Sequence, residues 1–166
     1  MAKDRFLLII LLTIVALAGL AVALFFVRQG SQDYASDDTP QNVVRNYVLA
    51  LEKKDFARAY AYLRQGAGKP DFERFRQDFI GRGLDISNVA IQIGETQPSG
   101  KDVIVSVVVI RSGGGPFGDV YRESNSALLV LDESGAWLIA SMPYPYWGWD
   151  WYNPQLLKPA PAIPGD

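Results

Sequence analysis

The sequence TPQNVVRNYVLALEKKDFARAYAYL, residues 39–63, has the pattern of two short helices joined by a tight turn. Thr39 offers an N-cap hydroxyl, and Pro40 follows at the first helical position, where a missing N–H costs nothing. Asp55 can cap the second helix in the same way. Apolar residues recur at helical spacing in both segments: Val44, Tyr47, Val48 and Leu51, then Phe56, Ala59, Tyr60 and Leu63. The two apolar faces predict a helical hairpin on a shared core.

A third, shorter helix is predicted after the break at residues 65–70. Asp71 can cap it, and Gly81 to Gly83 can end it. The helix would carry Phe72, Phe75 and Phe79 on one face. Its other face is charged, which is typical of a solvated surface.

After residue 84 the spacing of apolar residues changes from 3.6 to 2, which predicts a sheet. Four strands are expected: 89–94, 103–110, 119–131 and 137–142. The second is apolar on both faces apart from Ser106, which favours a central strand covered on both sides. Short turns between successive strands require antiparallel neighbours. The predicted fold is therefore α+β, with two to three amphipathic helices packed on a curved antiparallel meander of four or more strands.

An apolar segment precedes this domain. Residues 6–27, FLLIILLTIVALAGLAVALFFV, hold 22 residues without a charge. A helix of that length covers about 33 Å, enough for the roughly 30 Å hydrocarbon core. We therefore expect a transmembrane helix in contact with the lipid bilayer, running from Phe6 through Leu12 and Gly19 to Val27. A cleaved signal peptide is the alternative, although the apolar run continues beyond the cleavage-like box at residues 21–23.

Cationic residues flank this segment unequally. Lys3 and Arg5 precede it and Arg28 alone follows, so the N-terminus is expected in the cytoplasm and the domain outside the cell membrane. The chain then divides into four parts: 1–28, a cytoplasmic stub and span; 29–38, a flexible polar linker; 39–142, the α+β domain; and 143–166, an aromatic and proline-rich arm.

Composition excludes several kinds of function. The chain has no cysteine, the residue that supplies thiolate ligands and thiol nucleophiles. It also has no histidine, the commonest metal ligand and the usual general base. Net charge is -2 with acidic and basic residues interspersed, so no nucleic-acid partner is expected. We predict no metal site, no cofactor and no catalytic residue, because chemistry would have to rely on carboxylates, Tyr, Lys or Ser.

Three segments resemble the nuclear transport factor 2-like superfamily, also called SnoaL-like or cystatin-like. They are the helical opening at residues 39–63, the strand KDVIVSVVVI at 101–110 and the closing strands ALLVLDESGAWLIASM at 127–142. The resemblance implies a sheet curved around a cone-shaped cavity, with helices on its concave face. Fold alone does not assign a function. Residues expected to line such a cavity here are Tyr47, Tyr60, Phe79, Tyr121 and Trp137.

Enzymatic members of that superfamily hold a buried Asp or His base, often beside a Tyr donor. The acids near strand ends in this chain are Asp85, Asp102, Asp119 and Glu123. The possible donors are Tyr60, Tyr62 and Tyr121. Nothing in their spacing places an acid in the cavity, so an enzyme with an Asp/Tyr site is the least favoured interpretation.

The most unusual stretch is PYPYWGWDWYNP, residues 143–154. It contains six candidate interface aromatics: Tyr144, Tyr146, Trp147, Trp149, Trp151 and Tyr152. They are expected to cover the domain as a flap, to lie in the membrane interface, to dock another protein, or to stack on a sugar. An extended segment would place the three indoles on one side. The tail that follows is proline-rich and expected to be extended.

These observations favour a membrane-anchored, non-catalytic interaction module. It would bind one or more protein partners, as an accessory or stabilising subunit of a larger membrane complex. The alternative is an extracytoplasmic domain that binds a small molecule or lipid in the cone-shaped cavity.

Overall fold

The computed structural model describes residues 2–29, 33–81, 83–113 and 118–153. By their contacts they form two units, Met1–Asp33 and Tyr34–Asp166. The first unit is helix α1 (Ala2–Gln29), whose side chains are described for residues 8–22 and are all exposed. Within the described part of the chain, no helix has the length and apolar character needed to cross a membrane.

Three further helices belong to the second unit: α2 (Pro40–Glu52), α3 (Phe56–Ala61) and α4 (Phe72–Ile80). Their predicted caps are confirmed. The side chains of Thr39, Asp55 and Asp71 each accept the backbone N–H three residues later, at 3.3, 3.1 and 2.8 Å. These bonds satisfy N–H groups that no helical carbonyl can reach.

Helix α3 ends two residues earlier than predicted. The chain after it turns to run beside strand β4 (Trp137–Ser141). There the N–H of Ile139 donates to the carbonyl of Tyr62 at 2.8 Å, and the N–H of Arg64 donates to the carbonyl of Ile139 at 3.0 Å. Leu63 therefore leaves the helix and forms a short parallel bridge with Ile139. This pairing covers part of an edge that would otherwise be open.

The sheet has four strands: β1 (Val89–Ser99), β2 (Asp102–Ser112), β3 (Val120–Leu131) and β4 (Trp137–Ser141). Their spatial order is β1-β2-β3-β4 and every pair is antiparallel, which confirms the predicted α+β meander. Strand β1 is longer than expected. It passes an irregularity between Ile93 and Thr96 and continues to pair with β2 as far as Ser99. Pro98 is tolerated there because β1 is an edge strand.

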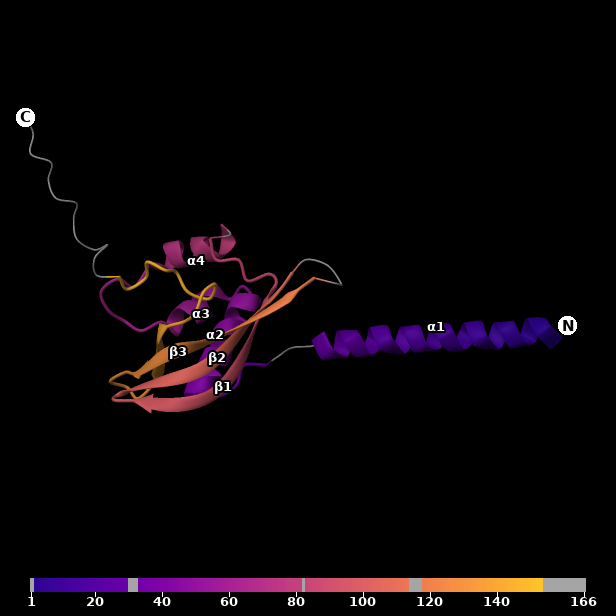
Figure 1. Ribbon diagram of the computed structural model, residues 1–166, viewed down its shortest axis with the longest axis horizontal. Helices are drawn as coiled ribbons and strands as arrows, with labels where there is room; N and C mark the ends of the chain where they lie inside the picture. Colours follow the sequence, from indigo (N-terminus) through magenta and orange to yellow (C-terminus); the bar gives the residue numbers. More distant parts are fainter. Residues whose placement is uncertain (1, 30–32, 82, 114–117, 154–166) are drawn as a thin grey trace, which may run out of the picture. The chain divides into compact units, whose positions relative to one another are not determined.

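Helix α2 lies over one face of the sheet (Figure 1) and contacts β1, β2 and β4. The side chains on this inner face are buried: Val105, Val107, Val109, Ala127, Leu129 and Ile139. The prediction that β2 is covered on both faces is wrong. Its opposite face carries Ile104, Val108 and Ile110, which are only half-buried, because the described helices of this unit pack on the other side.

The predicted flexible linker is also wrong in part. Residues 30–32 lie outside the described residues, but the segment from Tyr34 to Asp37 is fixed to α2 and α3. The side chain of Asn46, which is fully buried, accepts from the N–H of Ala35 at 2.9 Å and donates to its carbonyl at 2.8 Å. The guanidinium of Arg58 stacks 3.5 Å from the ring centroid of Tyr34. The globular unit therefore begins at Tyr34, five residues before the expected start.

Candidate functional site

The described part of the C-terminal arm, residues 143–153, folds back on its own domain, as the yellow segment near α4 shows (Figure 1). Tyr146, Trp147 and Trp151 are buried in the core, whereas Trp149 is 82% exposed. Of the four expected roles, the flap over the domain is the one seen for most of these aromatics. The expectation for an extended segment does not apply, because turns place the indoles of Trp147 and Trp151 edge to face at 5.1 Å and leave Trp149 outside.

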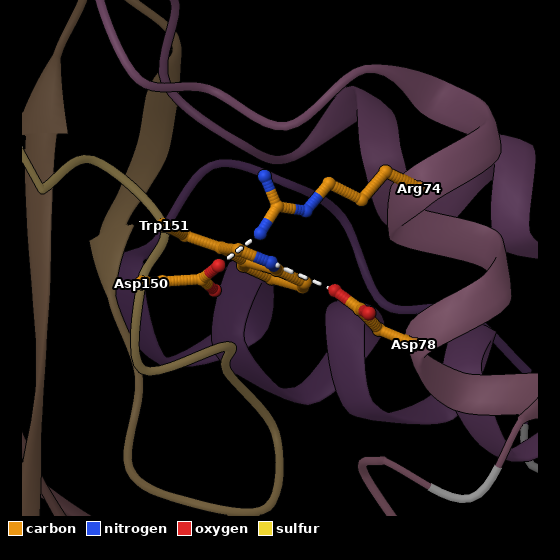
Figure 2. A network of polar contacts seen from close by, with 4 residues as sticks. All are labelled: Arg74, Asp78, Asp150 and Trp151. Atoms are coloured by element: carbon orange, nitrogen blue, oxygen red, sulfur yellow. Dashed lines mark hydrogen bonds and ion pairs between the residues drawn. The ribbon is translucent and has the colours of Figure 1, made fainter. Parts of the chain in front are cut away.

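Helix α4 holds the arm by a charged and a polar contact (Figure 2). The guanidinium of Arg74 pairs with the carboxylate of Asp150. One turn along the same helix, the carboxylate of Asp78 accepts the indole N–H of Trp151 at 3.0 Å. The ring of Trp151 also packs 5.3 Å from that of Phe75. The face of α4 predicted to be a solvated surface therefore supplies the residues that fix the arm.

Tyr146 reaches the centre of the domain. Its side chain is fully buried, and its backbone carbonyl accepts the hydroxyl of Tyr47 from α2 at 2.7 Å. Its own hydroxyl donates to the carbonyl of Val89 at the start of β1, at 3.3 Å. An arm residue thus occupies the space between helix and sheet in which the family resemblance implies a cavity. Burial raises the pKa of both phenols above the ordinary value.

The end of the arm rests on the loop before α4. The N–H of Tyr152 donates to the carbonyl of Gly68 at 2.8 Å, and its hydroxyl donates to the carbonyl of Arg64 at 2.6 Å. Gly68 has φ +83, and a Cβ there would lie 2.7 Å from the Cα of Tyr152. This position therefore requires glycine both for its backbone conformation and for the close approach of the arm.

Two arm aromatics remain exposed. Trp149 lies in a turn between Trp147 and Trp151, whose side chains are both buried in the core. Its own indole points into solvent from that turn. Tyr144 is 57% exposed; its carbonyl accepts from the guanidinium of Arg111 at 3.0 Å, and the same guanidinium lies 5.3 Å from its ring.

Of the five residues expected to line a cavity, four belong to the core or pack against it, and Tyr121 does not. Tyr47 is in the core, while Tyr60 and Phe79 are half-buried in the aromatic cluster with Phe75. Tyr121 is 66% exposed on the long β2–β3 hairpin, outside the core. Trp137 lines a shallow surface pocket on the α3 side. These four residues therefore contribute to the packed core, and Tyr121 lies outside it.

The four candidate acids also lie outside the interior. Asp85, Asp119 and Glu123 are exposed, and Asp102 is half-buried at the start of β2. Asp85 accepts from the N–H and hydroxyl of Ser87 in its own turn. In the described residues, Asn46 is the one polar side chain in the buried set, and no group of acids could hold a metal ion.

Arg74, Asp78 and Asn46 were missed by the sequence analysis, although each makes a contact that organises the arm or the segment before α2. The sequence of α4 gave a weak indication of these contacts, because Arg74 and Asp78 lie one helical turn apart and therefore on the same side of the helix. Asn46 gave a clearer one, because it lies between buried positions of an amphipathic helix and a buried amide requires a partner.

Burial of the arm phenols predicts alkaline unfolding. Burial raises the pKa of Tyr152 to about 12, against an ordinary value of 10. Above pH 10 the unfolded chain releases this proton and the folded chain keeps it, so the free energy of unfolding falls as the pH rises from about 10 to 12 and is unaffected below. Urea unfolding of the full-length protein in mild detergent measures this fall. Tyr152→Phe should reduce it; equal profiles for the variant and the natural protein would contradict the prediction.

No protein-family model and no curated protein matches the chain. Solved structures match at low identity. A SEC-C motif containing protein from Rhodopseudomonas palustris has 13% identity and a TM-score of 0.45, with 64% of this chain and 79% of that chain covered. An uncharacterised cystatin fold protein from Novosphingobium aromaticivorans has 13% identity and a TM-score of 0.41, with 64% and 97% covered. A candidate ketosteroid isomerase from Shewanella frigidimarina has 14% identity and a TM-score of 0.40, with 60% and 88% covered. These similarities assign neither a family nor an activity to this chain.

Proposed function

We propose that the protein is a membrane-anchored, non-catalytic interaction module that binds a protein partner through Trp149. The observation that supports this most is the exposure of Trp149 between two buried neighbours. Trp is among the residues that most often dominate binding energy at protein interfaces. Because the chain on both sides of Trp149 is already held by buried residues, its backbone has little conformational freedom left to lose when a partner binds.

The anchor is part of the same proposal. Its support is the uncharged sequence of residues 6–27 and helix α1, in which Thr13 is the one polar side chain among the described residues 8–22. A helix that is apolar all round requires a non-aqueous environment. The basic residues before it favour a cytoplasmic N-terminus and a domain on the other side of the membrane.

A non-catalytic role is favoured by two observations. The sequence has neither histidine nor cysteine, and the candidate acids lie at exposed or half-buried strand ends, away from the phenols of the core. A general base has to reach its substrate proton within hydrogen-bond distance, in a site that positions both.

Purification from native membranes tests the proposal. We expect the tagged full-length protein, solubilised in mild detergent, to migrate on a native gel as part of a larger assembly. Trp149→Ala should reduce the recovered partner at least about tenfold, because a hot-spot residue is worth about 2 kcal/mol or more. Its matched control is Tyr121→Ala, which removes an exposed aromatic side chain from the hairpin. Recovery of a lone monomer under every mild condition, or of the protein in the soluble fraction, would argue against the proposal.

One observation favours a second candidate, the binding of a small apolar molecule. A groove of about 470 Å³ lies between the ends of α2 and α4 and the loop before β1. Its apolar lining includes Leu51, Phe56, Phe79, Ile80 and Ile86. Native mass spectrometry of the full-length protein should then show a retained ligand that is lost in Ile80→Lys, whereas an unliganded mass would remove this candidate.

A further inference from the structure

The outer face of the sheet, opposite the helices, is unusually free of charge. Its positions on β2 and β3 are Ile104, Ser106, Val108, Ile110, Ser124, Ser126, Leu128 and Val130, and Leu138 continues it on β4. An antiparallel sheet with one face in water normally carries polar side chains there, often charged ones. Here the charged residues of the two rows lie at their ends, Asp102 on β2 and Arg122 on β3, and no charge lies between them.

The pairing register places small and large side chains in a regular arrangement on this face. Ser106 lies opposite Ser126 at the centre, with Ile104 opposite Leu128 on one side and Val108 opposite Ser124 on the other. The aliphatic side chains are half-buried by their neighbours within the sheet. Removal of this apolar surface from water would be favourable by roughly 25 cal/mol per Å².

We infer that this outer face binds the same face of a second copy of the chain. In a twofold interface each residue near the axis meets its own counterpart, so a charged residue there would face a like charge. The central residues avoid that conflict. A serine hydroxyl is both donor and acceptor, so Ser106 and Ser126 can each bond to their counterparts, and the flanking aliphatic side chains pack on one another.

The size of the face agrees with a modest dimer. The rows on β2, β3 and β4, about 4.8 Å apart and at most about seven residues long, cover a footprint of roughly 300 Å². A standard interface buries about 800 Å² of accessible surface on each partner, so this one lies toward the weak end. The inference depends on the proposed membrane anchor. Confinement to a membrane raises the effective concentration of two copies, so that even a weak contact is enough for them to pair.

A cysteine cross-link tests the inference directly, because the natural chain has no cysteine. Ser126→Cys places one thiol near the proposed axis. Under mild oxidation in native membranes we expect a disulfide-linked dimer, at a yield at least about tenfold above that of Gln77→Cys, an exposed position on α4. Equal yields at the two positions would overturn the inference.

A second variant separates self-association from other binding. Val108→Lys in the Ser126→Cys background places a charge inside the apolar part of the proposed interface, so the cross-linked dimer should be lost while the near-ultraviolet circular dichroism stays native. An unchanged dimer yield would overturn the inference. A complex that depends on Trp149 but contains one copy of this chain would also overturn it, and would leave the proposed function intact.

Discussion

Trp151→Ala should lower the free energy of unfolding by about 3–5 kcal/mol, the usual cost of removing a large buried aromatic side chain. Trp151 is 5% exposed and packs on the rings of Phe75, Phe79 and Trp147. Its removal also leaves the half-buried carboxylate of Asp78 without the indole donor. Urea unfolding of the full-length protein in detergent, followed by tryptophan fluorescence and near-ultraviolet circular dichroism, measures the change.

Trp149→Ala is the matched control, because it deletes the same side chain two residues away from an 82% exposed position. Its free energy of unfolding should change by less than about 0.5 kcal/mol, as is usual for surface substitutions. The two variants therefore separate stability from binding: the first should unfold readily, and the second should fold normally and lose its partner. Equal stability of the two variants would show that the arm does not contribute to the core.

The helices were predictable because each has a local signal for its beginning. Thr39, Asp55 and Asp71 are capping residues followed by apolar residues at helical spacing, and each caps the helix expected of it. The meander was predictable for a related reason. Short turns between alternating segments leave few topologies open, and the strand order follows the chain.

The arm was not predictable, because its fold depends on contacts far apart in sequence. Trp147, Trp149 and Trp151 alternate as in a strand, yet the turn between them is determined by Asp78 and Phe75 on α4. No local pattern encodes that partner. The prediction for the outer face of β2 was wrong for a different reason. An apolar residue predicts burial, but it does not indicate whether the residues that bury it belong to the same chain or to another molecule.

The segment before α2 gives the other large expected effect. Asn46→Ala should lower the free energy of unfolding by about 2–3 kcal/mol, because it removes a fully buried amide that makes three hydrogen bonds. Two of them join the Asn46 amide to the N–H and carbonyl of Ala35. In the third, the amide nitrogen of Asn46 donates to the carboxylate of Asp37 at 2.6 Å. The N–H and carbonyl of Ala35 would lose these partners, so residues 34–37 should detach from α2 before the domain unfolds.

Chymotrypsin cleavage after Tyr34, followed by mass spectrometry of the full-length protein, measures that detachment. A loss of about 2 kcal/mol of local stability corresponds to roughly thirtyfold faster cleavage. Asn42→Ala is the matched control, since Asn42 lies one turn earlier on α2 and makes a longer, exposed contact of 3.4 Å to Asp38. Its cleavage rate should stay within about twofold of the natural protein. If Asn46→Ala were cleaved no faster than Asn42→Ala, residues 34–37 would not be held by the buried amide, and only a loose connection would separate the globular unit from α1.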